Sequence, residues 1–141
     1  MNKARDKINL MSVGMSESIK KIITDKDVIS FANISGDNNP IHLSDKYAEN
    51  TRYKKRIAHG MLSASLFSAI FGTKLPGEGC VYLSQSLKFK IPIYIGDVVD
   101  AIVTIKHINK EKNTILFKTI CKVKNRIAIE GEAEIYLMNK K

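Results

Sequence analysis

Several residue types are scarce in this chain of 141 residues, and each scarcity excludes a class of protein. The two cysteines, Cys80 and Cys121, are too few for a disulfide scaffold and too far apart in sequence for a paired-ligand zinc motif. No apolar run approaches the roughly 18 residues that cross a membrane. The N-terminal segment MNKARDKINLMSVG lacks the apolar core of a secretory signal. We therefore expect residues 1–141 to form a single cytoplasmic domain with no membrane association.

Acidic residues are also few relative to basic ones. The chain has 23 Lys and Arg against 14 Asp and Glu, a formal net charge of +9. Such an excess attracts nucleic acid, an anionic membrane surface or a phosphorylated substrate. The sequence has no recognised nucleic-acid-binding motif, and the exposed faces of its expected strands lack a stacking aromatic platform, so we expect no nucleic acid partner.

The second half of the chain alternates apolar and polar residues with period two, which is typical of strands with one wet face. In the last segment, Ile127, Ile129 and Ile135 are expected to point inward and Ala128 outward. In the first segment, Val81, Leu83 and Phe89 are expected together on the apolar, covered side. Short polar turns between consecutive strands predict a largely antiparallel sheet. The expected strands are 80–91, 98–108, 114–124 and 126–138.

A sheet with one apolar face needs a layer that covers it. Residues 59–72, HGMLSASLFSAIFG, carry no charge after His59 and are rich in Ala, Ser and Gly. They predict a helix that is buried on most sides. A shorter helix is expected to begin at Thr24, whose hydroxyl can cap it, and another at Ser44 or Asp45.

The segment SGDNNPIHLSD at 35–45 combines dense turn residues with two groups that can exchange protons. Asp37 and His42, five residues apart across a stiffened loop, could converge and share one water as a general acid–base pair. Plainer readings remain open: Asp37 as a turn residue, His42 as a hydrogen-bonded buried histidine, and His59 as a competitor of His42 or as a packing or capping residue. No three of these groups have metal-ligand spacing, so we expect no metal site.

These motifs resemble those of the MaoC-like family of hot-dog proteins, and within it the (R)-specific enoyl-CoA hydratases. The resemblance rests on SGDNNPIHLSD (35–45), IAHGML (57–62), LPGEG (75–79) and YLSQSLKFKIPIYIGD (82–97), and it covers the chain from about residue 30. It implies an α+β hot-dog fold, in which a curved, largely antiparallel sheet wraps a long central helix. It also implies a lyase that adds water to the C2–C3 double bond of trans-2-enoyl-CoA, giving (R)-3-hydroxyacyl-CoA.

The resemblance assigns roles to individual residues. The family's catalytic pair corresponds to Asp37 and His42, and its oxyanion-stabilising backbone N–H corresponds to Gly60. Asn38 stands where relatives often carry an acidic or small residue, and we do not expect this to abolish catalysis. The chemistry needs no metal or redox cofactor. An edge strand left unpaired in one copy predicts at least a homodimer.

Helical periodicity extends the expected site into an acyl pocket. If the Gly60 amide faces the thioester, then Ser68 and Phe71 share that helix face. Ile135, inward on the last strand, is the candidate for the opposite wall. A bulky Phe71 ring would favour acyl chains of about four to six carbons, because overpacking a rigid pocket is costly. Phe71 as an ordinary core residue is the competing reading.

Three other functions stay open at the level of the sequence. The same residues could serve a 3-hydroxyacyl-thioester dehydratase of fatty-acid synthesis that acts on acyl carrier protein or coenzyme A. A thioesterase or a non-catalytic acyl-CoA sensor could use the same fold. The basic residues would attract the phosphates of coenzyme A or an acidic carrier protein. They are Arg52, Lys54, Lys55, Arg56, Lys118, Lys122 and Lys124.

Overall fold

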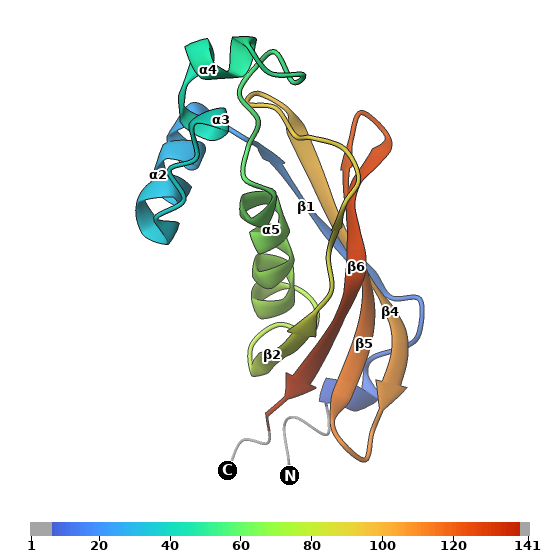
Figure 1. The fold of residues 1–141 in the computed structure, drawn as a ribbon. Coiled ribbons are helices and arrows are strands. Elements are labelled where there is room, and N and C mark those ends of the chain that lie inside the picture. The colour runs from blue at the N-terminus through green and yellow to red at the C-terminus, as the bar shows by residue number, and fades with distance from the viewer. Residues whose placement is uncertain (1–6, 139–141) are drawn as a thin grey trace.

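The computed structural model describes residues 7–138, which form a curved antiparallel sheet against one long helix (Figure 1). The strands lie in the order β1-β4-β5-β6-β2, and the short β3 also pairs with β6. Every pairing is antiparallel. The strands are β1 (Ser16–Ile22), β2 (Cys80–Gln85), β3 (Lys88–Phe89), β4 (Val98–Asn109), β5 (Thr114–Val123) and β6 (Arg126–Leu137).

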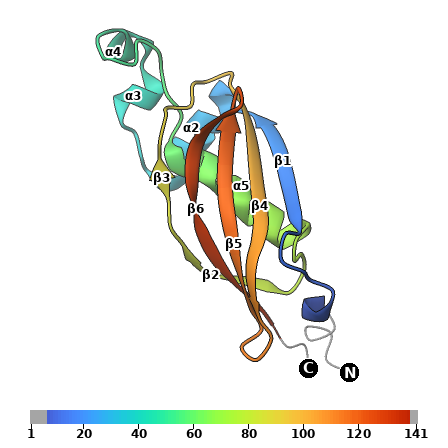
Figure 2. The same ribbon diagram turned by 90° about the vertical axis from the view of Figure 1, so that its right-hand side faces the viewer.

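The long helix α5 (Gly60–Thr73) covers the concave face of the sheet, behind β4, β5 and β6 in the view of Figure 2. Phe67, Ile70 and Phe71 of this helix are at most 1% exposed. They join a core with the inward side chains of the three long strands, such as Val103 and Phe117. The long uncharged helix and the α+β arrangement predicted from the sequence are therefore confirmed. The helix is buried along one face, not on most sides as expected, since Met61, Ser65 and Ser68 are exposed in the single chain.

Three short helices form a group beside the N-terminal end of α5 (Figure 1). They are α2 (Asp25–Ser35), α3 (Pro40–Leu43) and α4 (Asp45–Glu49). Thr24 caps α2 in a reciprocal capping box with Asp27, and Ser44 caps α4, both as their side chains predict. The one-turn helix α3 replaces part of the loop that the sequence predicts there.

Two strand predictions need correction at the edge formed by β2 and β3. The segment 80–91 is two strands, not one, because Ser86 and Leu87 interrupt the regular pairing, although the Ser86 N–H still donates to the Glu132 carbonyl oxygen. Val81, Leu83 and Phe89, expected on the covered side, are 39%, 52% and 53% exposed. This edge of the sheet is therefore apolar and open to solvent in the single chain.

A register shift also reverses the expected alternation in β6. Cys121 pairs with Ile129 and Lys122 pairs with Ile127, so Ala128 is an extra residue, a β-bulge. Ala128 is 0% exposed and Ile127 is 37% exposed, the opposite of the sequence prediction. Ile135, beyond the bulge, points inward as predicted.

Within residues 7–138, none of the helices combines the length and the apolar character needed to span a bilayer. The expectation that the N-terminal segment is no secretory signal concerns residues 1–14, of which residues 1–6 lie outside the described part of the chain.

Candidate active site

Asp37 follows the end of α2, where Gly36 adopts a left-handed conformation with φ of 80°. Glycine accepts this conformation without strain, and the chain turns sharply there. One carboxylate oxygen of Asp37, Oδ1, accepts a hydrogen bond from the Asn39 N–H at 3.2 Å. The other, Oδ2, lies 3.9 Å from Nε2 of His42. Asp37 is thus both a turn residue and a neighbour of the imidazole.

His42 lies in the last turn of α3 and is 8% exposed. Its Nδ1 lies 2.7 Å from the backbone carbonyl oxygen of Ile57. A carbonyl only accepts, so Nδ1 carries the proton in the neutral ring and Nε2 presents a lone pair toward Asp37. Arg56 donates from Nε to the His42 carbonyl oxygen at 2.7 Å and forms an ion pair with Asp25.

This position of Arg56 corrects part of the expected basic surface. The Arg56 side chain is only 13% exposed, because it ties α2 to α3. Its neighbours Lys54 and Lys55 are exposed and remain available to an anionic partner. The exposed basic residues before α5 are therefore Arg52, Lys54 and Lys55, without Arg56.

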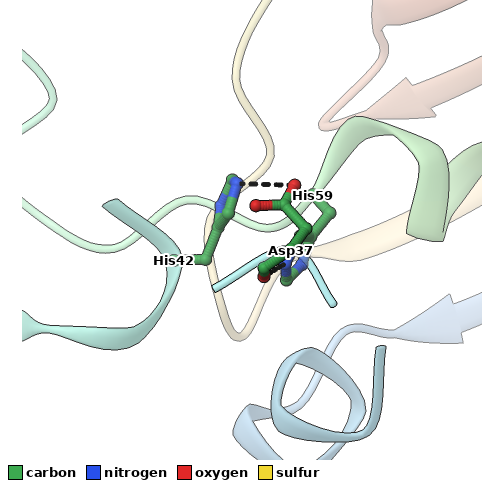
Figure 3. Close-up of side chains that lie close together, drawn as sticks. All are labelled: Asp37, His42 and His59. Atoms are coloured by element: carbon green, nitrogen blue, oxygen red, sulfur yellow. Dashed lines mark hydrogen bonds and ion pairs between the residues drawn. The ribbon is translucent and has the colours of Figure 1, made fainter. Parts of the chain in front are cut away.

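His59 is the third member of the cluster, and Figure 3 shows its ring beside Asp37 and His42. The His59 and His42 rings stack, with centroids 3.9 Å apart and planes inclined by 29°. Nε2 of His59 lies 3.0 Å from the backbone carbonyl oxygen of Asp37, to which it donates. His59 precedes α5 but makes no side-chain cap to it. The capping role considered from the sequence is therefore wrong.

Possible ligand atoms of Asp37, His42 and His59 lie within 4.8 Å of one another, a closeness that sequence spacing did not predict. A shared ion would need both imidazole lone pairs to converge on a point about 2.0–2.1 Å from each nitrogen. Stacked rings direct their lone pairs along nearly parallel planes, which do not converge at that distance. The geometry favours an acid–base pair over a metal centre.

A cleft of about 360 Å³ lies beside this cluster and reaches the first residue of α5. Gly60 is the first residue of the helix, so its N–H has no partner within the helix. This N–H lies at the positive end of the helix dipole. The ring of Phe89 lies directly over the Gly60 Cα: a Cβ there would be 2.6 Å from Phe89 Cδ1. Arg52 and Lys90 add positive charge. The lining residues are His42, Arg52, Tyr53, Ile57, Ala58, Gly60, Met61, Phe89, Lys90, Ile91, Pro92, Ile93 and Ile129.

The expected acyl-pocket residues lie farther along α5 and on β6. Ser68 is exposed, whereas Phe71 and Ile135 are 1% and 0% exposed. The Phe71 ring packs against Phe117 at 4.7 Å and Tyr82 at 5.2 Å between centroids. These three residues are not part of the lining of the cleft beside Gly60. Their role in binding an acyl chain stays a prediction.

Sequence reasoning missed two residues of this site. Phe89 was expected to be a covered strand residue, and its place over Gly60 depends on the pairing of β3 with β6. His59 was weighed as a competitor of His42 and as a packing or capping residue, but not as a partner of the pair. The A-H-G run at 58–60 was the available signal, since it puts an imidazole immediately before the first free N–H of the buried helix.

The curved sheet against one long helix defines a hot-dog protein, and Asp37 and His42 lie together beside its cleft. The family model for the MaoC like domain matches residues 12–130, so the chain belongs to the MaoC-like family. The resemblance inferred from the sequence motifs is confirmed.

Named relatives agree with this assignment. The chain is 49% identical over 122 residues to the (R)-specific enoyl-CoA hydratase of Rhodospirillum rubrum, covering 86% of this chain and 85% of that protein. It is 42% identical over 130 residues to the 3-hydroxybutyryl-CoA dehydratase of Methylorubrum extorquens, covering 92% and 83%. A solved structure, the (R)-hydratase from A. caviae involved in PHA biosynthesis, has a TM-score of 0.89 and 38% identity over 91% of this chain and 98% of that one.

Proposed function

We propose that this protein is an (R)-specific enoyl-CoA hydratase, a hydro-lyase that adds water across the C2–C3 double bond of a trans-2-enoyl-CoA. The observation that carries the proposal is the approach of Asp37 Oδ2 to His42 Nε2, 3.9 Å apart, beside a cleft that reaches Gly60. Relatives named for the hydration and for the dehydration of CoA thioesters support it, since one site catalyses both directions.

The separation of the pair suits one shared water. At 3.9 Å the two atoms are too far apart for a direct hydrogen bond, but both can contact one water at about 2.8 Å. The lone pair on Nε2 of His42 takes a proton from this water as its oxygen forms a bond to C3. A proton then returns from the pair to C2, so H and OH are added from one side of the double bond. General acid–base catalysis of this kind contributes about 10²–10⁴-fold.

Gly60 supplies the second requirement of the reaction. When water attacks C3, the electron pair of the double bond moves toward C2 and the thioester oxygen gains negative charge. The N–H at the start of α5 is a fixed donor for that charge, in the positive field of the helix dipole. Loss of a comparable donor typically costs about 2.7–4 kcal/mol of transition-state stabilisation.

The charge around the cleft supports an acyl-CoA substrate. Arg52 and Lys90 line the cleft, and Lys54 and Lys55 are exposed nearby in sequence. Coenzyme A carries phosphates and acyl carrier protein is acidic, so either would be attracted. The stereochemistry follows from the family resemblance.

We further propose a homodimer located in the cytoplasm. The apolar residues Val81, Leu83 and Phe89 are exposed along the β2–β3 edge, and a second copy would cover them. Cys80 and Cys121 are both free thiols, which suits a reducing compartment.

The test is the loss of absorbance of the enoyl-thioester band when the protein is mixed with crotonyl-CoA, followed by chiral analysis of the product. We expect hydration to the (R)-3-hydroxy product without release of free thiol. Thiol release would indicate a thioesterase, and the (S)-product would contradict the proposal. Faster turnover of crotonyl carrier protein than of crotonyl-CoA would favour the dehydratase of fatty-acid synthesis instead.

A further inference from the structure

His59 is a buried titratable residue that this mechanism does not use. It is 3% exposed, and its ring contacts two other rings. The centroid distance is 3.9 Å to His42 and 4.8 Å to Phe31. Its Nε2 bonds to the Asp37 carbonyl oxygen. Within residues 7–138, its Nδ1 is buried and has no hydrogen-bond partner.

These contacts determine which nitrogen of the neutral His59 ring carries the proton. The Asp37 carbonyl oxygen needs a donor, so the proton of the neutral ring lies on Nε2. The lone pair of the neutral ring then lies on Nδ1, which meets no donor from the described residues. His42 has the opposite arrangement, with its proton on Nδ1 facing the Ile57 carbonyl. In their neutral forms the two stacked rings are therefore opposite tautomers.

We propose that His59 is a positioning residue that holds both members of the Asp37–His42 pair. Its N–H fixes the Asp37 backbone, and its ring face fixes the plane of the His42 ring. The aromatic face also stabilises the positive charge that His42 gains when it takes a proton from water. This inference rests on the proposed function, because it assigns a part in the same reaction.

His59 does not line the cleft, so the inference predicts different effects of its substitution on kcat and on KM. A residue that orients the pair without touching the substrate affects the chemical step more than substrate binding. Misplacing a catalytic group by about 1 Å can cost as much as 100-fold in rate. We therefore expect changes at His59 to lower kcat and to leave KM nearly unchanged.

Two conservative variants separate the two contacts. His59→Phe keeps an aromatic face but has no donor, and His59→Gln keeps a donor but has no aromatic face. We expect each to lower kcat for crotonyl-CoA hydration about tenfold and His59→Ala to lower it about 100-fold. KM should stay within about twofold of the wild-type value in all three. Val103→Ala, a buried truncation in β4, controls for loss of stability and should leave kcat nearly unchanged.

The outcomes are distinct. Wild-type kcat in folded His59→Ala would overturn the inference, and so would a loss that falls on KM alone. A spectroscopic arm is independent of activity: two-bond ¹⁵N–¹H correlation spectra of the full chain should show His59 protonated on Nε2 and His42 on Nδ1, with His59→Phe and His42→Asn assigning the signals. The same tautomer in both rings would overturn the inference. If the wild-type protein does not hydrate crotonyl-CoA, the proposed function fails, and the spectra alone decide whether His59 holds the pair.

Discussion

The Phe89 ring lies over the Cα of Gly60 so closely that a side chain at position 60 would force the ring to move. A Cβ there would be 2.6 Å from Cδ1 of the ring, well inside van der Waals contact. A strand far away in sequence thus favours glycine at the first residue of α5. In the proposed mechanism, the N–H of this glycine receives the thioester oxygen.

We therefore expect Gly60→Ala to lower the free energy of unfolding by about 1–3 kcal/mol through overpacking, and to reduce kcat. In a Phe89→Ala background the same substitution should cost at least about 0.5 kcal/mol less, a coupling that a double-mutant cycle measures. Gly72→Ala is the control, since a Cβ there meets no atom of the described residues within 4 Å. Equal costs of Gly60→Ala in both backgrounds would contradict the contact.

Removing either member of the Asp37–His42 pair should abolish most activity without unfolding the protein. In Asp37→Asn the amide oxygen can still accept from Asn39, and in His42→Asn the amide can still donate to Ile57. Each variant should lose about 10²–10⁴-fold in kcat with crotonyl-CoA while its melting temperature changes little. Asp45→Asn, a carboxylate that is 85% exposed, should behave as wild type. Near-normal kcat in either variant would refute the assignment.

Phe71→Ala tests whether this ring closes the acyl pocket. If it does, the ratio of kcat/KM for ten-carbon to four-carbon enoyl-CoA should rise, because space opens beyond Ser68. Truncating a buried Phe also costs about 3–5 kcal/mol, so the rates are compared on folded protein. Ile70→Ala, the preceding buried residue of α5, is the matched control. An unchanged ratio with a lower melting temperature would leave Phe71 a core residue.

The proposed homodimer predicts a solution mass twice that of the chain at micromolar concentration. Leu83→Glu puts a charge on the exposed edge strand β2 and should shift the protein toward monomer in light scattering. Ile34→Lys changes an apolar residue that is 86% exposed on α2, and it should leave the mass unchanged. A wild-type monomer would count against the dimer, and an unchanged Leu83→Glu dimer against this interface.

The capping box of α2 predicts a pH-dependent contribution to stability. The hydrogen bond from the Thr24 backbone N–H holds the pKa of Asp27 below its usual value of 3.8, with help from the Thr24 hydroxyl and Lys21. The carboxylate therefore stabilises the fold above about pH 4, and this contribution is lost as pH falls through the lowered folded-state pKa. Asp27→Asn keeps an acceptor oxygen but removes the charge, so it should cost about 0.3–1 kcal/mol at pH 7 and less at pH 3, measured by denaturant unfolding. A cost that does not change with pH would contradict the role of the charge.

The sequence predicts best where one residue's environment follows from its neighbours along the chain. The alternation in β4 and β5, the uncharged run of α5 and the caps Thr24 and Ser44 are local patterns, and all are confirmed. The strand β1 was missed because apolar and polar residues do not alternate in its sequence, SESIKKI. The bulge at Ala128 was missed because it depends on pairing with β5, which no alternation within β6 encodes.

The site also combines contacts that local sequence predicts with contacts that depend on the fold. The turn chemistry of 36–40 showed that the side chains of Asp37 and His42 could converge, and the family resemblance selected them as a pair. They lie 3.9 Å apart. The stacking of His59 on His42 could not be predicted, because residues 43–58 separate them and only the fold sets their relative orientation. Phe89 meets Gly60 through the pairing of β3 with β6, which is again a contact between distant segments.

The proposed chemical groups all lie within the continuous stretch 37–60, held by helix caps, turns and Arg56, whereas much of the cleft wall comes from residues 89–93 and β6. Residues 91–93 thus line the cleft without holding any of the proposed chemical groups, whereas Phe89 packs over Gly60 and is tied to them. Substitutions at 91–93 could therefore change which thioesters fit while descendants of this protein inherit the reaction unchanged.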